Sequence, residues 1–166
     1  MSDINFFQEE VSFQLSHQDI LKGWIATIIQ NAKHSFDTIN FIYCSDNYLL
    51  EINKEYLDHD YYTDIITFDN TEDNGSALDA DIFISIDRVK ENATQLNLPF
   101  EQELHRVMVH GILHLLGHED KTEEQKKEMR ESEEASLSLL HIWTKFHVFH
   151  VKLFRLAQLF HVELLI

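Results

Sequence analysis

The sequence is poor in the residues that build disulfide frameworks, flexible linkers and basic surfaces. Of 166 residues, one is cysteine, one is proline and four are glycine. Cys44 alone forms no disulfide within the chain and no zinc site of several thiolates, so we expect a reducing, cytoplasmic setting. The chain has 13 basic and 29 acidic residues, which gives a net charge of −16. Charge alone therefore disfavours nucleic-acid binding, which normally uses a basic surface.

Long apolar runs are absent as well. The chain starts without a basic segment followed by an apolar one, and no stretch reaches about 18 apolar residues, so we expect neither a signal peptide nor a membrane span. Hydrophobic residues make up 44% of the chain and charged residues 25%. This composition excludes a disordered or collagen-like chain and suits one globular domain.

Hydrophobic periodicity predicts a mixture of strands and helices. Because the two types do not alternate strictly, we expect one small mixed sheet packed against helices. Ser45 and Asp46 are expected to cap one helix, and Thr122 to cap another. The predicted strands cover 4–13, 38–44, 63–68 and 81–86, and the predicted helices cover 17–34, 47–57, 87–96, 100–116 and 122–140.

The segment HGILHLLGHED, residues 110–120, carries the strongest chemical signal. His110 and His114 lie one helical turn apart, so both imidazoles face the same side and suit one metal ion. Gly117 is the residue expected to end the helix in a left-handed conformation. Asp120 stands where the long zinc-protease signature places its third histidine, and we favour it as third ligand over His118 and Glu119. His118 would point towards the ion only if the helix continued past Gly117.

Two imidazoles and one carboxylate leave a fourth position for water, as in catalytic zinc sites. We therefore expect one zinc ion per chain, with iron, nickel or copper as other occupants. The zinc proteases carry a glutamate base directly after the first histidine, and here that position is Gly111. This difference argues against a peptidase. The general acid and base are not identified by the sequence.

The same segment resembles the YbeY-type endoribonucleases, whose motif is H-G-x-L-H-L-x-G followed by a third ligand. The resemblance extends over about residues 5–140. Outside the histidine motif, it rests on TDIITF at 63–68, on Ile52, Asn53 and Tyr56, on Asp81 and Ile82, and on Glu128, Met129 and Glu133.

The resemblance implies a zincin-like α+β domain over residues 1–140, with about four strands and about five helices. It implies a zinc-dependent hydrolase, a single-strand-specific endoribonuclease that processes the 3′ end of 16S rRNA during ribosome maturation. The implied partners are rRNA and the ribosome or its proteins. Two alternatives stay open: another metallohydrolase, acting on a peptide or small molecule, and a non-catalytic ribosome-assembly factor with a structural metal.

Two positions depart from the family pattern. Asp120 stands where the family usually has histidine, and aspartate is also a good zinc ligand. Leu57 stands where the family commonly has an arginine suited to a phosphate contact. The sequence does not choose among the residues that could replace this arginine, which are Lys54, His59, Arg88 and Arg106.

Three further residues invite a chemical reading but have plainer explanations. Cys44, in an apolar strand, is expected to be a small buried hydrophobe. His105 lies on a different face of the helix from His110 and is expected to be structural or exposed. Glu103 is expected to be a solvated acid on the helix surface.

Residues 141–166 form an apolar tail outside the resemblance. Polar residues at His141, Thr144 and Gln158 permit a helix with one wet face. Its four histidines, which include His147 and His150, have no regular ligand spacing, so a second metal site is not favoured. We expect the tail to pack on the core or to mediate self-association, with a membrane surface as a further alternative.

Overall fold

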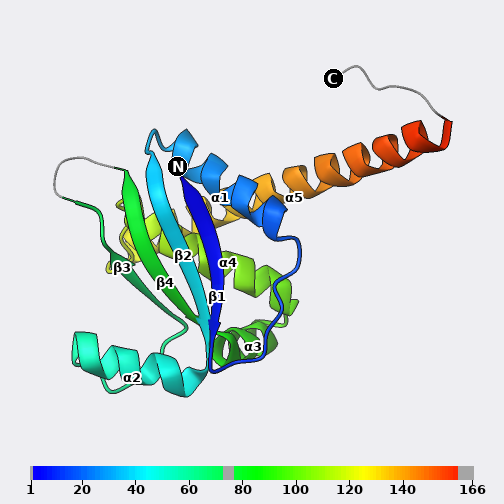
Figure 1. Ribbon diagram of the computed structural model, residues 1–166. Helices are drawn as coiled ribbons and strands as arrows, with labels where there is room; N and C mark the ends of the chain where they lie inside the picture. The colour runs from blue at the N-terminus through cyan, green and yellow to red at the C-terminus, as the bar shows by residue number, and fades with distance from the viewer. Residues whose placement is uncertain (1, 73–76, 161–166) are drawn as a thin grey trace.

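The computed structural model describes residues 2–72 and 77–160, with side chains described as far as Lys145. Its described part contains four strands and five helices (Figure 1), in agreement with the predicted α+β class. In chain order these are β1 (Asp3–Glu9), α1 (Gln18–Asn31), β2 (Phe36–Cys44), α2 (Asp46–Leu57), β3 (Ile65–Asp69), β4 (Leu78–Ser85), α3 (Ile86–Leu96), α4 (Phe100–Leu115) and α5 (Glu123–Phe160).

The strands form one mixed sheet in the order β1-β2-β4-β3. β1, β2 and β4 are parallel, whereas β3 runs antiparallel to β4. Parallel neighbours need a crossover connection, which α1 supplies between β1 and β2. The expected mixed sheet is therefore confirmed, and the single antiparallel strand lies at one edge, beside α4.

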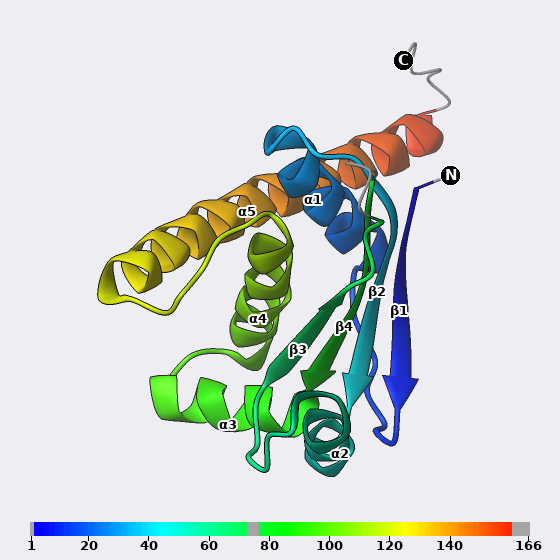
Figure 2. The same cartoon turned by 90° about the vertical axis from the view of Figure 1, so that its left-hand side faces the viewer.

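The main core lies between the sheet and the helices α1, α4 and α5, which cover one face (Figure 2). Phe41 and Ile82 of the central strands are fully buried there. Burial of such a side chain stabilises the fold by roughly 1.5–3 kcal/mol. Trp24 of α1 is also fully buried, and its indole Nε1 donates a hydrogen bond of 2.7 Å to the Ser136 carbonyl of α5. This bond ties α5 to the body of the domain.

α4 lies very close to the sheet at Gly111. A Cβ atom at this position would lie 2.8 Å from Ile65 Cδ1, 3.0 Å from Thr67 Oγ1 and 3.2 Å from Ile82 Cγ2. Carbon atoms in normal contact are about 3.5–4.0 Å apart, so a side chain here would push α4 away from β3 and β4. The glycine therefore sets the distance between the sheet and the helix that carries both histidines.

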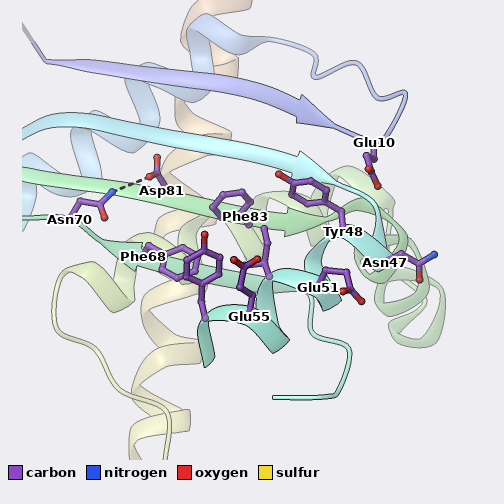
Figure 3. A pocket seen from close by; sticks show the side chains of 11 residues that line it. Glu10, Asn47, Tyr48, Glu51, Glu55, Phe68, Asn70, Asp81 and Phe83 are labelled. Carbon is purple, nitrogen blue, oxygen red and sulfur yellow. Dashed lines mark hydrogen bonds between the residues drawn. The ribbon is translucent and has the colours of Figure 1, made fainter. Parts of the chain in front are cut away.

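α2 covers part of the opposite face of the sheet. Leu49 of α2 packs there against Cys44 and Ile66 in a second, smaller core. Beside this core, a cavity of about 610 Å³ opens between α2 and the sheet (Figure 3). Aromatic rings and carboxylates line it, among them Tyr48 and Glu55. The predicted metal ligands do not line this cavity.

Two element boundaries differ from the prediction by more than three residues. β1 ends at Glu9 rather than near Phe13, because Glu10 has a positive φ of 53° that no extended strand can contain. α5 does not stop near Leu140 but continues to Phe160, away from the rest of the domain (Figure 1). Its predicted start is confirmed, since Thr122 Oγ1 accepts a hydrogen bond from the Gln125 backbone N–H.

The tail predictions are only partly open to comparison. The helical character expected after Leu140 is present to Phe160. The side chains of His147 and His150, and residues 161–166 with His161, lie outside the described part of the chain. Within that part, no helix combines the length and the hydropathy that crossing a bilayer requires.

Replacing Gly111 with alanine tests the close packing of α4. Alanine normally stabilises a helix relative to glycine, but here the overpacking against Ile65 and Thr67 is expected to cost about 1–3 kcal/mol. We expect the Tm of Gly111→Ala to fall by roughly 3–10 °C in a thermal unfolding scan. An unchanged or higher Tm would show that the helix is not held at this distance.

Candidate metal centre

α4 places the two predicted histidine ligands, and the turn after it brings back the third. The helix ends as expected: Gly117 has a φ of 90°, and the His118 N–H donates to the Leu113 carbonyl at 3.0 Å. These features reverse the chain within three residues. Asp120 thereby returns to the helix face that carries His110 and His114.

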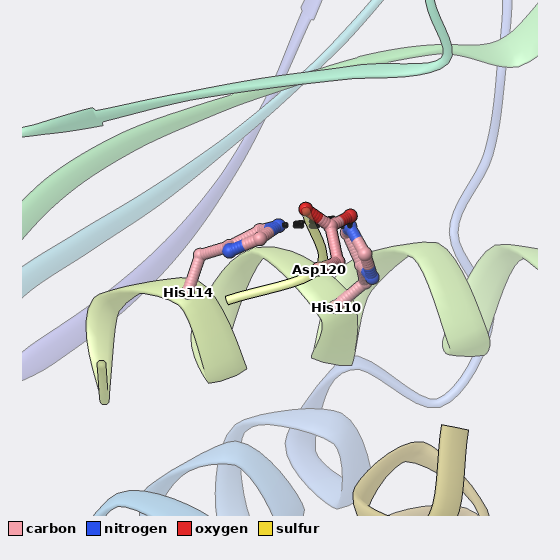
Figure 4. Close-up of side chains that lie close together, drawn as sticks. All are labelled: His110, His114 and Asp120. Atoms are coloured by element: carbon pink, nitrogen blue, oxygen red, sulfur yellow. Dashed lines mark hydrogen bonds and ion pairs between the residues drawn. The ribbon is translucent and has the colours of Figure 1, made fainter. Parts of the chain in front are cut away.

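The three side chains converge on one point (Figure 4). His110 Nε2 lies 3.0 Å from His114 Nε2. Asp120 Oδ2 lies 3.7 Å from His110 Nε2 and 3.8 Å from His114 Nε2. Around an ion bound at about 2.0–2.1 Å, tetrahedral ligand atoms stand roughly 3.3 Å apart, so the observed spacing suits one divalent ion.

The hydrogen bonds of the two Nδ1 atoms determine whether the Nε2 atoms, which face each other, carry a proton or a lone pair. His114 Nδ1 lies 2.9 Å from the His118 carbonyl oxygen, which can only accept, so this Nδ1 carries the proton. His110 Nδ1 lies 2.7 Å from Glu133 Oε1, a carboxylate that likewise accepts. In the neutral rings both Nε2 atoms therefore present lone pairs to each other and to Asp120. Three converging lone-pair donors repel one another unless a cation lies between them, so the donor set fits a metal ion.

The site is open on one side. The side chains of His110, His114 and Asp120 are 18%, 33% and 43% exposed. A structural zinc site is normally closed by four protein ligands, whereas a catalytic site keeps a position for water. Among the residues that the structure describes, only these three gather into such a cluster, so an ion bound here would keep a position for water.

The two alternative ligands take other roles. His118 contributes its backbone carbonyl, which orients the His114 ring. Glu119 accepts a hydrogen bond of 2.8 Å from the Gln125 side chain and lies 3.5 Å from Lys121 Nζ. Neither residue belongs to the cluster of potential ligand atoms. The structure therefore brings together the set that we favoured from sequence.

A buried acid–base network supports His110 from behind. Glu103 is fully buried, so the expectation that it is a solvated surface acid is wrong. Arg106 Nη2 donates to Glu103 Oε1 at 2.6 Å, and Arg106 Nη1 donates to Glu133 Oε1 at 3.3 Å. The hydrogen bonds to Glu103, followed by the charges of Glu103 and Glu133, raise the pKa of Arg106 above its ordinary value. Burial of these acids is possible because the guanidinium neutralises them.

Sequence reasoning missed the contact from Glu133 to His110. The two residues are 23 positions apart and lie on different helices. The only signal was that Met129 and Glu133 match a family pattern, which says nothing about what the carboxylate touches. Here Glu133 accepts the Nδ1 proton, and so it fixes both the tautomer and the ring orientation of His110.

Two other titratable residues lie outside this chemistry. Burial lowers the pKa of His105 to about 4, and its ring packs edge-on against Trp24. Burial, followed by the charges of Asp46 and Asp87, raises the pKa of the Cys44 thiol to about 12. A neutral imidazole packed beside Trp24 and a buried, protonated thiol fit the structural roles expected for both residues.

A cavity of about 570 Å³ lies over the three ligands, between α4, β3 and the segment that follows α2. Leu57, the residue in the place of the family arginine, lines it, and so does His59. No lysine or arginine is among the described residues that line it. The three basic candidates for the missing arginine are held by ion pairs: Lys54 with Asp60 (3.1 Å), Arg88 with Asp46 (2.8 Å) and Arg106 with Glu103 (2.6 Å). Of the four candidates, His59 is thus the one that lines the cavity together with the ligands.

The Glu133 contact predicts a measurable effect on metal affinity. Glu133→Gln keeps the size of the side chain but removes the charge that accepts the His110 proton, so affinity for zinc should fall about 10-fold or more. Competition with a chromophoric chelator measures this change. Glu131→Gln is the matched control, because Glu131 lies on the same helix, is exposed and pairs only with Lys127 among the described ion pairs. Equal zinc affinity in both variants would contradict the role assigned to Glu133.

Comparisons with known proteins identify the family. The family described as Endoribonuclease YbeY matches residues 3–141. The protein named Endoribonuclease YbeY from Cytophaga hutchinsonii is 52% identical over 136 residues, which cover 82% of this chain and 94% of that protein. The protein of the same name from Christiangramia forsetii is 47% identical, with coverage of 84% and 96%. The solution structure of TM1509 from Thermotoga maritima superposes with a TM-score of 0.59 at 28% identity, with coverage of 88% and 93%. The chain therefore belongs to the Endoribonuclease YbeY family.

Proposed function

We propose that this protein is a metal-dependent endoribonuclease that cleaves single-stranded RNA, with one zinc ion held by His110, His114 and Asp120. The observation that carries the proposal is the convergence of three lone-pair donors at the base of an open cavity, with both imidazoles held in one tautomer. Family membership supports an endoribonuclease rather than another hydrolase.

A bound ion would supply the reactive chemistry, and the residues of the chain would hold the ion in position. A bound divalent ion polarises water and stabilises negative charge on a phosphate group. Glu133 and the His118 carbonyl accept the two Nδ1 protons, which would leave both Nε2 lone pairs available to hold an ion. Asp120, a carboxylate in place of an imidazole, supplies one negative charge, so the loaded site is less positive than one with three histidines. The cavity over the ligands is where the RNA would approach the ion.

The alternative of a peptidase fits the geometry poorly. A metalloprotease would need its glutamate base at position 111, where the structure has glycine. A side chain there would meet Ile65 at 2.8 Å, so this face of α4 has no space for a base. A purely structural metal is also less suitable, because the three ligands are partly exposed.

The biological setting is part of the same proposal. We place the activity in the cytoplasm, in processing of the 3′ end of 16S rRNA on the ribosome or its precursors. With a net charge of −16, the protein would depend on ribosomal partners to bring the RNA close. We assign catalysis to residues 1–140 and propose self-association as the role of the tail, 141–166.

Substitution of Asp120 tests the proposal most simply. Asp120→Ala should reduce zinc from about one ion per chain to a small fraction of that, because two imidazoles alone bind an ion weakly. RNA cleavage should be lost with the metal. Asp120→His restores the residue that is usual in the family and should retain both. Elemental analysis of protein purified without chelator or nickel resin measures the metal.

His118→Ala is the matched control, because only its backbone carbonyl contacts the site. It should keep about one zinc per chain. Full metal in Asp120→Ala, or loss of metal in His118→Ala, would reject the proposed ligand set. A wild type that holds zinc but cleaves no RNA would reject the endoribonuclease.

A further inference from the structure

The cavity above the metal ligands contains two aromatic rings that the chemistry proposed so far does not use. His59 and Tyr61 both line it. Their rings are stacked, with centroids 5.1 Å apart and an angle of 27° between the planes. Tyr61 is 57% exposed, so its ring contributes little to the core. A large aromatic surface is therefore open to solvent beside His110, His114 and Asp120.

This pair of rings is held in place by specific contacts. Tyr61 Oη lies 3.1 Å from His59 Nδ1, which links the two side chains. Asn53, at the end of α2, is 2% exposed and anchors both residues through the main chain. Its Nδ2 donates to the Tyr61 carbonyl at 2.8 Å, and its own carbonyl accepts from the His59 N–H at 3.1 Å. Asn53 thus holds the main chain at both residues, and one hydrogen bond links the two rings to each other.

The charges around the cavity limit how it can bind RNA. Asp64 and Asp69 line it together with Asp120, and no lysine or arginine does so within the described chain. Apart from a bound ion, phosphate groups therefore find little attraction at this surface. Stacking of bases on aromatic rings does not depend on the phosphate charge, and it accepts every base because each has a π face. Stacking is therefore a contact that the described lining of this cavity can offer to RNA.

The geometry points to His59 and Tyr61 as a stacking platform that receives one unpaired base of the RNA beside the metal centre. This inference rests on the proposed endoribonuclease function and deepens it. In a duplex, the faces of each base are covered by its neighbours, whereas a single strand can place a base on the rings. The platform would therefore select single-stranded RNA and position it, in the place of the arginine that the family commonly has at Leu57.

Tyr61 variants of the full-length protein test this platform. The probe is a single-stranded RNA octamer that carries 2-aminopurine, whose fluorescence is quenched by stacking. Its Kd is measured with EDTA-treated protein, and KM and kcat for cleavage are measured with zinc-loaded protein. Tyr61→Ala and Tyr61→Leu should raise Kd and KM about 10- to 100-fold. Zinc content and kcat at saturating RNA should stay within about twofold. Tyr61→Phe, which keeps the ring, should stay within about threefold in every readout.

Tyr62→Ala is the matched control. Tyr62 is a neighbouring tyrosine, 46% exposed, but its ring lies under the Arg88 guanidinium at 4.6 Å and does not line the cavity. It should bind the octamer like the wild type. Tyr61→Leu removes the aromatic ring but keeps a large apolar side chain, so it tests stacking even where the alanine variant fails to fold.

Salt dependence gives an independent readout. If stacking dominates, log Kd of the wild type should change with log salt concentration by a slope of less than about 1, corresponding to about one phosphate contact. A slope of several units, or an unchanged Kd in Tyr61→Leu, would overturn the platform. If the wild type cleaves RNA and the Tyr61 variants bind and cleave it equally well, the stacking platform is overturned but the proposed endoribonuclease function is not. A wild type that neither binds nor cleaves RNA would overturn the proposed function as well.

Discussion

The orientation of two imidazole rings is the constraint on which the site depends. Each ring uses its Nδ1 proton in a hydrogen bond, His110 with Glu133 and His114 with the His118 carbonyl. The Nε2 lone pairs are then directed at one another across 3.0 Å, with the Asp120 carboxylate beside them. Such an arrangement is unfavourable without a positive charge between the donors. The folded arrangement of these donors therefore favours the binding of a cation at this point.

The rest of the fold maintains this arrangement. Gly111 allows α4 to lie against β3 and β4, which places the histidines beneath the edge of the sheet. Gly117 ends the helix and turns the chain back, so that Asp120 completes the ligand set. α5 supplies Glu133 and is tied to α1 through the bond between Trp24 and the Ser136 carbonyl. Each of these contacts joins two elements, and together they fix the site from the sheet, the helix and the turn.

The features that depended on local sequence were the ones that could be predicted. The i,i+4 spacing of His110 and His114 and the glycine after them identified the ligand cluster, because helix geometry alone determines where these side chains point. Helix and strand positions followed from periodicity in the same way. The burial of Glu103 could not be foreseen, since it depends on Arg106 and on a partner network from α5. The unbroken continuation of α5 from Leu140 to Phe160 differs from the predicted helix end, since neither glycine nor proline occurs between these residues to mark a boundary.

An acidic protein that acts on RNA must obtain affinity from sources other than overall charge. Here the described cavity offers three potential metal ligands and exposed aromatic rings, while Lys54, Arg88 and Arg106 are engaged with acids. All of this chemistry depends on the histidine tautomers. Long-range ¹H–¹⁵N NMR correlation of the ring nitrogens, recorded with and without zinc, tests them directly. The account predicts that His110 and His114 are both protonated at Nδ1, and that zinc shifts both Nε2 resonances. A proton on Nε2 of either neutral ring, or Nε2 resonances that do not respond to zinc, would contradict it.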